Sequence, residues 1–279
     1  MICDKRIEAQ LPEWRERVAK LVREKGDVKV GDVTIAQVYG GMRGVKALVT
    51  DISYVDPNEG IHLRGHTISE LLEKLPRAEG AEMPMVAGLY YLLLVGEIPT
   101  MEAAREVEKE WRARWDVPSY VYDVLRAMPA DTHPMTLFSQ AILSMQRESV
   151  FAKQYHQGLR KEDYWKPMLE DSISLTAKLP AIAAFIYRLK YKDGSIIPPD
   201  PNLDLGANFA HMMGVTKKGY DELSRLYFII HSDHESGNVS AHATHLVGSA
   251  LSDIYYAASA AINGLAGPLH GLANQECLG

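Results

Sequence analysis

The chain has 279 residues, a mass of 31.1 kDa and a formal net charge of −6, with 47% hydrophobic and 24% charged residues. This composition is typical of a globular protein and excludes an intrinsically disordered chain. The mild acidity provides no general attraction to nucleic acid or to an anionic membrane, and no apolar run approaches the roughly 18 residues that a membrane span requires. Two cysteines, Cys3 and Cys277, are too few for a disulfide framework or a four-cysteine zinc site and favour a reducing, intracellular compartment.

The first predicted helix opens at Leu11-Pro12-Glu13 and ends at Gly26, because apolar residues recur at helical spacing between these points. The pattern then changes between Val28 and Ile61, where short apolar runs are separated by turn signals at Gly31-Asp32 and at residues 56–60. This stretch predicts short strands and loops, including a hairpin at Gly31-Asp32.

From Thr67 onward nearly the whole chain is predicted to be helical. Residues 85–95 are almost wholly apolar and are expected to be buried on all sides, whereas Thr100 is a suitable N-cap for a charged surface helix over 101–115. Further helices are predicted at residues 69–75, 119–127, 135–149, 152–159, 167–178, 181–190, 220–231, 240–261 and from 269 on. Residues 192–204, with three prolines, are expected to form a loop. The predicted fold class is therefore mainly α, with short β pieces near the N-terminus.

Histidines are concentrated in one segment, and another follows it: His231, His234, His242, His245 and His270. On one unbroken helix the offsets of 3, 11 and 14 residues would place the first four on one face. The turn at residues 236–238 instead predicts a break, with His231 ending one helix and His234 in the connecting loop. Asn238 would then cap the next helix.

Four interpretations of this cluster compete. In the first, the histidines are partly buried core residues. In the second, they form a metal site, since H-x-x-H beside an acid can bind zinc. In the third they perform acid–base chemistry in a polar pocket, and in the fourth they recognise an anionic substrate beside a helix N-terminus. The metal site is the least favoured, because the second pair of histidines lies beyond a turn and no cysteine is near.

Two sequence motifs resemble citrate synthase of the eukaryotic type. They are H-S-D-H-E-S-G-N-V-S-A-H from His231 and N-G-L-A-G-P-L-H-G-L-A-N-Q-E from Asn263 to Glu276. Further blocks resemble this family in the same order, at residues 40–44, 56–57, 59–61, 64–65, 96–100 and 133–135. The resemblance covers nearly the whole chain, and so many ordered blocks make it very specific.

The resemblance implies an all-α homodimer whose protomer has a large domain and a small, mobile one. It implies that residues 67–279 are an incomplete, multi-helical large domain and that residues 1–66 are an N-terminal helix with short strands packed on it. The implied enzyme is an acyltransferase that condenses acetyl-CoA with oxaloacetate and water to citrate and CoA, at the entry to the tricarboxylic acid cycle. No cofactor or metal is expected, since acetyl-CoA is a substrate, and neither nucleic acid nor membrane is an expected partner.

The same resemblance assigns roles to individual residues. His270 corresponds to the donor that faces the developing enolate oxygen, and its place near a helix start favours the neutral imidazole that such a donor requires. His234 resembles the histidine that binds oxaloacetate. Asn238 and Ser240 resemble polar neighbours that orient these imidazoles, although a plain helix cap explains Asn238 equally well. Arg43 resembles an arginine that meets coenzyme A phosphates, although a surface charge explains it equally well.

Several family residues have no counterpart in these 279 positions. In the family a second histidine, the catalytic aspartate, the arginines that clamp oxaloacetate and the small domain all come later in the chain. The chain is therefore expected to resemble the N-terminal part of the large domain and to lack a full active site on its own. A smaller departure is His62-Leu63, where the family usually has arginine and an aromatic residue.

Two other functions remain open from the sequence. A non-catalytic subunit would pair with a full-length chain through residues 135–149 and 240–261, which resemble the helices through which the family dimerises. An unrelated metallohydrolase would use the histidine cluster, but the flanking blocks disfavour it. Residues 1–10 carry neither a secretory signal nor a transit peptide. The expected location is cytoplasmic for a bacterial chain and the mitochondrial matrix for a processed eukaryotic chain.

Overall fold

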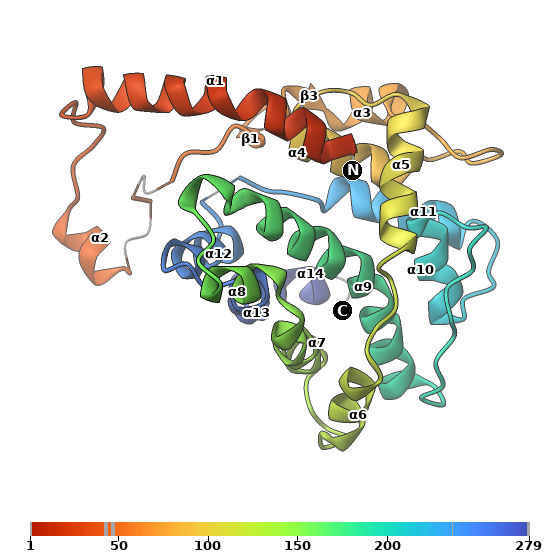
Figure 1. Ribbon diagram of the computed structural model, residues 1–279. Coiled ribbons are helices and arrows are strands. Elements are labelled where there is room, and N and C mark those ends of the chain that lie inside the picture. The colour runs from red at the N-terminus through yellow and green to blue at the C-terminus, as the bar shows by residue number, and fades with distance from the viewer. Residues whose placement is uncertain (1, 42–43, 46–47, 236, 278–279) are drawn as a thin grey trace.

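The structure is a computed structural model that describes residues 2–41, 44–45, 48–235 and 237–277. Helices dominate it, as predicted (Figure 1). They are α1 (Ile2–Lys25), α2 (Ile35–Tyr39), α3 (Ile68–Lys74), α4 (Val86–Val95), α5 (Met101–Arg112), α6 (Ser119–Ala127), α7 (Pro134–Ser144), α8 (Val150–His156), α9 (Trp165–Tyr191), α10 (Leu205–Met213), α11 (Tyr220–Ile230), α12 (Val239–Ser249), α13 (Ile254–Leu265) and α14 (Ala273–Glu276). In the described part of the chain no helix has the length and apolar character needed to cross a membrane.

One small antiparallel sheet accompanies the helices. Its strands, in order, are β1 (Ser53–Asp56), β2 (Gly60–Leu63) and β3 (His66–Thr67), and Ser53 pairs with Leu63 across the first hairpin. The turn predicted at residues 56–60 joins β1 to β2. The strands extend to Thr67, a few residues beyond the predicted limit at Ile61, because β2 turns back into β3 before α3 begins.

Two predictions for the N-terminal segment are wrong. Helix α1 begins at Ile2 rather than at Leu11, because its first turns are anchored in the protein: Cys3 is buried against residues of α4 and α5. The hairpin expected at Gly31-Asp32 is absent from the described residues, and α2 follows instead. Thr34 and Gln37 form a reciprocal capping box that starts this helix. The prediction followed the alternating apolar residues before Thr34 and did not take this capping box into account.

The long helix α9 lies at the centre of the helical layer and contacts α5, α7, α8, α10 and α13 (Figure 1). Two helices separated at Pro180 were predicted here, and this is wrong, because Pro180 lies inside one continuous helix. A proline removes one backbone hydrogen bond. Buried residues beyond it, Ile182, Phe185 and Ile186, pack in a core cluster with α6, α7 and α13, and this burial outweighs the lost bond.

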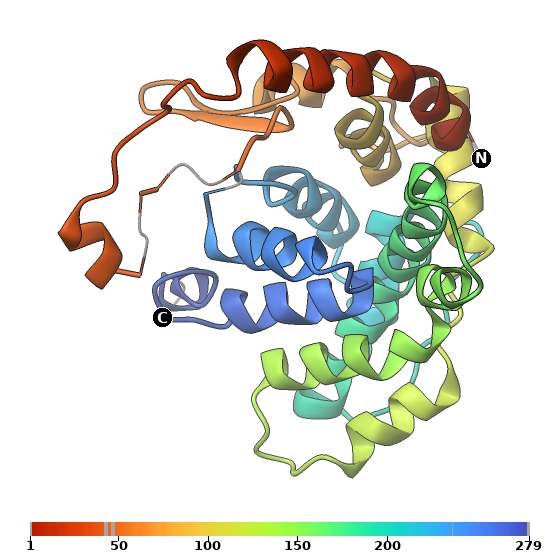
Figure 2. The same cartoon turned by 60° about the vertical axis from the view of Figure 1, so that its left-hand side comes forward.

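Residues 240–261 also differ from the prediction, because they form two helices rather than one. Leu251 adopts a left-handed conformation with φ of 61°, which ends the course of α12. Asp253 then caps α13 by accepting hydrogen bonds from the backbone N–H groups of Tyr255 and Tyr256, at 3.0 and 3.2 Å. Helices α12 and α13 pack side by side, and the C-terminal turn and α14 lie at the far end of α13 (Figure 2).

Two further boundaries differ from the prediction: the helix predicted over 135–149 ends at Ser144 and is followed by a short 3-10 helix, Met145–Glu148, and the helix predicted from 269 begins at Ala273. Most of the remaining boundaries follow the sequence closely. Helix α4 is largely buried, as its apolar sequence predicted, and Thr100 caps α5 by accepting from Ala103 N at 3.2 Å. Helix α6 has the predicted bounds, and residues 192–204 form the predicted loop. Helix α10 was not predicted, because its signal is Asp204, an N-cap at the end of that loop. The division into parts at residue 66 stays a prediction.

Candidate active site

The histidine segment has the predicted break between two helices. His231 is the C-cap of α11, His234 lies exposed in the connecting loop, and Asn238 is the N-cap of α12. The Asn238 side chain uses both ends of its amide: Oδ1 accepts from Ala241 N at 3.0 Å, and Nδ2 donates to the backbone oxygens of His234 and Glu235 at 2.7 and 2.8 Å. Asn238 therefore caps the helix and also fixes the backbone of the His234 loop.

Ser240 and His270 are brought together by the packing of α12 and α13. Ser240 lies in the first turn of α12, and its Oγ is 2.7 Å from Nε2 of His270. His270 lies in the turn between α13 and the short helix α14, and both side chains are half-buried. Because one nitrogen of a neutral imidazole donates and the other accepts, a Ser240 hydroxyl that donates to Nε2 leaves the proton on Nδ1.

The turn that carries His270 is held from two more sides. Asn274 Nδ2 donates to the Tyr227 hydroxyl of α11 at 2.9 Å. At Gly271 a Cβ atom would lie 2.6 Å from the backbone oxygen of Leu265, closer than real Cβ atoms approach. The absence of a side chain after His270 thus lets the turn fold against the end of α13.

The sequence model described as "Citrate synthase, C-terminal domain" matches residues 41–279 of the chain. This chain belongs to the citrate synthase family. The match includes the loop of His234, the N-terminus of α12 and the turn of His270, which are the residues that the fold gathers.

Relatives in the family agree with this assignment. Citrate synthase 4, mitochondrial, of Arabidopsis thaliana is 48% identical over 272 residues, which are 98% of this chain and 57% of that protein. The mitochondrial citrate synthase of Saccharomyces cerevisiae is 50% identical over 268 residues, 96% of this chain and 56% of that protein. The crystal structure of citrate synthase from Pyrobaculum aerophilum gives a TM-score of 0.74 at 27% identity, over 89% of this chain and 60% of that one. The chain thus spans little more than half the length of these relatives.

The other histidines of the segment are dispersed. His231 stacks on Tyr227, with ring centroids 4.1 Å apart and an interplanar angle of 22°. His242 and His245 lie further along α12, and His245 is exposed. In the described ranges no three His, Cys, Asp or Glu side chains are grouped so that they could hold a metal ion. The interpretation as buried core histidines is wrong for His231, His234 and His245, because all three are exposed.

Arg43, the predicted coenzyme A contact, lies outside the described residues. Sequence reasoning missed three residues around His234: Asp233 and Glu235 flank it in the loop, and Ser53 of β1 bonds to both. The Ser53 hydroxyl donates to Asp233 Oδ2 and accepts from Glu235 N. These partners are about 180 positions apart in the chain, and no local pattern identifies such a pair.

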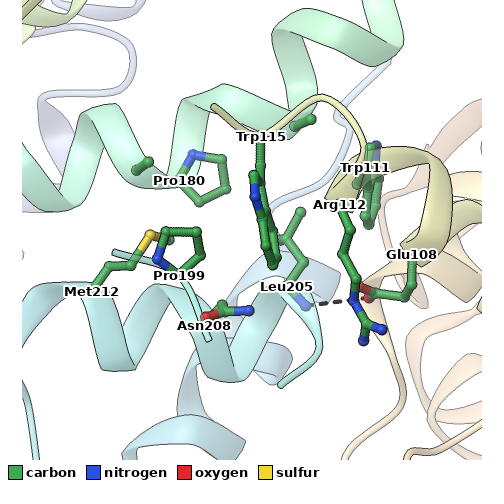
Figure 3. Close-up of a pocket in the computed structure, with 11 residues that line it drawn as sticks. Glu108, Trp111, Arg112, Trp115, Pro180, Pro199, Leu205, Asn208 and Met212 are labelled. Carbon is green, nitrogen blue, oxygen red and sulfur yellow. Dashed lines mark hydrogen bonds between the residues drawn. The ribbon is translucent and has the colours of Figure 1, made fainter. Parts of the chain in front are cut away.

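A separate, narrow pocket lies between α5, α9 and α10 (Figure 3). Figure 3 shows Pro180 and Pro199 on one side of the Trp115 ring and the buried Glu108 on the other. Glu108 Oε1 accepts from Leu205 N at 3.2 Å. Burial is the main cause that raises the pKa of Glu108 to about 7. The pocket shares no residue with the histidine site, so we regard Glu108 as a buried structural carboxyl rather than as part of that site.

Proposed function

We propose that this chain is part of an enzyme that condenses acetyl-CoA with oxaloacetate and water to give citrate and CoA, at the entry to the tricarboxylic acid cycle. The observation that carries the proposal is the hydrogen bond between Ser240 and His270 at 2.7 Å. It joins the first turn of α12, where Asn238 folds the His234 loop, to the turn that presents His270.

The chemistry requires removal of a proton from the methyl group of a thioester, which is a very weak acid. A hydrogen-bond donor facing the thioester oxygen stabilises the enolate that forms. When Ser240 donates to Nε2, His270 is a neutral imidazole with its proton on Nδ1, and this N–H is the proposed donor. The base is proposed to be the carboxylate that the family carries after the positions matched here. Acid–base groups suffice for this reaction, so no cofactor or metal is proposed.

His234 is the proposed contact to an oxaloacetate carboxylate. Its ring is exposed on a loop whose backbone is held by Asn238, so it is available to a ligand while its main chain is fixed. Arg43 is proposed to meet coenzyme A phosphates.

We also propose that the enzyme is a homodimer. Large apolar side chains are exposed on the helices that resemble the family's dimer contacts: Leu143 on α7, Leu246 on α12 and Tyr256 on α13, with exposed fractions of 38, 66 and 45%. Burial of such apolar side chains in an interface with a partner subunit stabilises the complex. The mitochondrial relatives support a matrix location in a eukaryote, and a bacterial protein would be cytoplasmic.

The test is release of free thiol from acetyl-CoA in the presence of oxaloacetate, using protein expressed from its complete reading frame. Thiol release that depends on oxaloacetate is expected, and His270→Ala should reduce kcat by about 10²–10⁴-fold. His245→Ala, an exposed histidine on α12, is the matched control and should retain activity. Absence of thiol release from the unsubstituted, folded protein would reject the proposed function.

A further inference from the structure

Strand β1 contacts both residues that flank His234. The Ser53 hydroxyl donates to Asp233 Oδ2 and accepts from Glu235 N, the latter at 2.7 Å. Two positions along the same strand, Val55 N donates to Glu235 Oε1 at 2.8 Å. The loop before and after His234 is therefore bonded to one strand from the N-terminal part of the chain.

These bonds hold a backbone conformation that is unfavourable by itself. Glu235 has φ of 53°, in the left-handed region that residues with a Cβ atom rarely adopt. Its N–H is bonded to Ser53, its carboxylate to Val55 and its carbonyl oxygen to Asn238 Nδ2 at 2.8 Å. Because surrounding bonds determine such a conformation, their loss should let the residue next to His234 relax.

The strand is itself fixed to the core, so it is a firm support for the loop. Ser53 pairs with Leu63 of β2, which is 1% exposed. The adjacent Arg64 donates from Nε and Nη2 to the backbone oxygen of Leu93 in α4, at 3.1 and 2.7 Å, and pairs with Asp51 at 3.0 Å. The hairpin is thus anchored on α4 and on the buried cluster beneath the sheet.

Ser53 has the chemistry that this position needs. Its hydroxyl donates to one flanking residue and accepts from the other, and the residue is 7% exposed, so water does not readily replace it. Alanine can make neither bond, whereas threonine can make both. The strand and the Asn238 side chain hold the loop from two sides and leave the His234 ring exposed.

We propose that Ser53 is a positioning residue for oxaloacetate binding, which acts by fixing the backbone on both sides of His234. This inference rests on the proposed function, since it assigns oxaloacetate as the ligand of His234. It extends the site from the α11–α12 connection to strand β1, about 180 residues earlier in the chain.

The experiment compares Ser53→Ala and Ser53→Thr in the protein expressed from its complete reading frame. Ser53→Ala should raise the KM for oxaloacetate by about tenfold, as expected for loss of a hydrogen bond to a charged group, with kcat and the KM for acetyl-CoA changed less than twofold. Ser53→Thr should restore the KM for oxaloacetate to within about threefold of the unsubstituted protein.

Ser149→Ala is the matched control. Ser149 is also a buried serine that donates to an aspartate, Asp171 Oδ2 at 2.8 Å, but it lies at the start of α8, where its hydroxyl accepts from Ala152 N at 3.0 Å. This variant should lower the unfolding temperature and leave the KM for oxaloacetate unchanged. An unchanged oxaloacetate KM in Ser53→Ala would overturn the proposal, as would an equal rise in Ser149→Ala.

A readout without turnover separates this inference from the proposed function. The imidazole NMR signal of His234, assigned by its loss in His234→Ala, should be single and sharp in the unsubstituted protein and shifted or multiple in Ser53→Ala. The Ser53→Thr spectrum should match the unsubstituted one, and it decides the matter if Ser53→Ala does not fold. Identical His234 signals in Ser53→Ala and the unsubstituted protein would overturn the positioning role, whether or not the protein releases thiol.

Discussion

Ser240 and His270 are 30 residues apart in the chain, and their side chains meet at 2.7 Å because α12 and α13 fold back on each other. The contact sets which imidazole nitrogen is bonded within the protein and which is available to a ligand. It also makes α12 a structural support for the His270 turn.

The Ser240 hydroxyl is therefore expected to control the His270 tautomer. Ser240→Ala should lower kcat for the proposed condensation by about tenfold, since one oriented hydrogen bond is lost, with a smaller change in the KM values. Steady-state kinetics of the complete protein measure both. Ser249→Ala should behave like the unsubstituted protein, because the hydroxyl of this α12 serine donates to Leu246 O in the same helix at 2.7 Å. Equal kcat values for the two variants would contradict this role.

Gly271 is expected to tolerate no side chain. A Cβ atom there would approach the backbone oxygen of Leu265 to 2.6 Å, so Gly271→Ala should displace the His270 turn and destabilise the fold by about 1–3 kcal/mol. Thermal unfolding and kcat together report the effect. At Gly31 a Cβ atom would meet open space, so Gly31→Ala is the control and should change neither quantity. A fully active and stable Gly271→Ala protein would show that the turn rearranges freely.

Glu108 is expected to make stability depend on pH. Burial raises its pKa from an ordinary 4.5 to about 7, so the folded protein keeps a proton that the unfolded chain has lost. This contribution to stability is complete below about pH 4.5 and is lost as the pH rises through about 7, at most about 3 kcal/mol.

Glu108→Gln keeps an acceptor for Leu205 N and removes the titration. Its free energy of unfolding, measured by urea denaturation from pH 5 to 8, should fall less with rising pH than that of the unsubstituted protein. Glu102→Gln, in the first turn of the same helix, provides the reference for removal of one charge. Parallel pH profiles for Glu108→Gln and the unsubstituted protein would refute the assignment.

Arg225 is expected to be essential for stability, because its guanidinium neutralises the buried Asp204. The Nε–Oδ2 distance is 2.8 Å, and the side chains are 7% and 3% exposed. Arg225→Met leaves an uncompensated carboxylate that also caps α10, and it should lower the free energy of unfolding by about 3–5 kcal/mol. Arg160→Met breaks the exposed pair with Asp163 and should cost less than about 1 kcal/mol. Similar losses in the two variants would show that burial does not strengthen the pair.

Much of this protein was determined locally and could be predicted from its sequence. The caps Thr100 and Asn238, the bounds of α6 and the apolar course of α4 depend on residues within one or two helical turns. These signals depend on neighbouring residues only, so they can be recognised in the sequence without knowledge of the tertiary contacts. The ordered motifs around His234 and His270 also identified the family before any geometry was known.

The tertiary structure decided where local signals are overridden. Packing of Phe185 keeps α9 continuous through Pro180, and contacts of Cys3 start α1 at Ile2. The meeting of Ser53 with the His234 loop depends on two segments about 180 residues apart. Burial and hydrogen bonds of this kind exist only after the chain has folded, because their free energy comes from removing distant groups from water together.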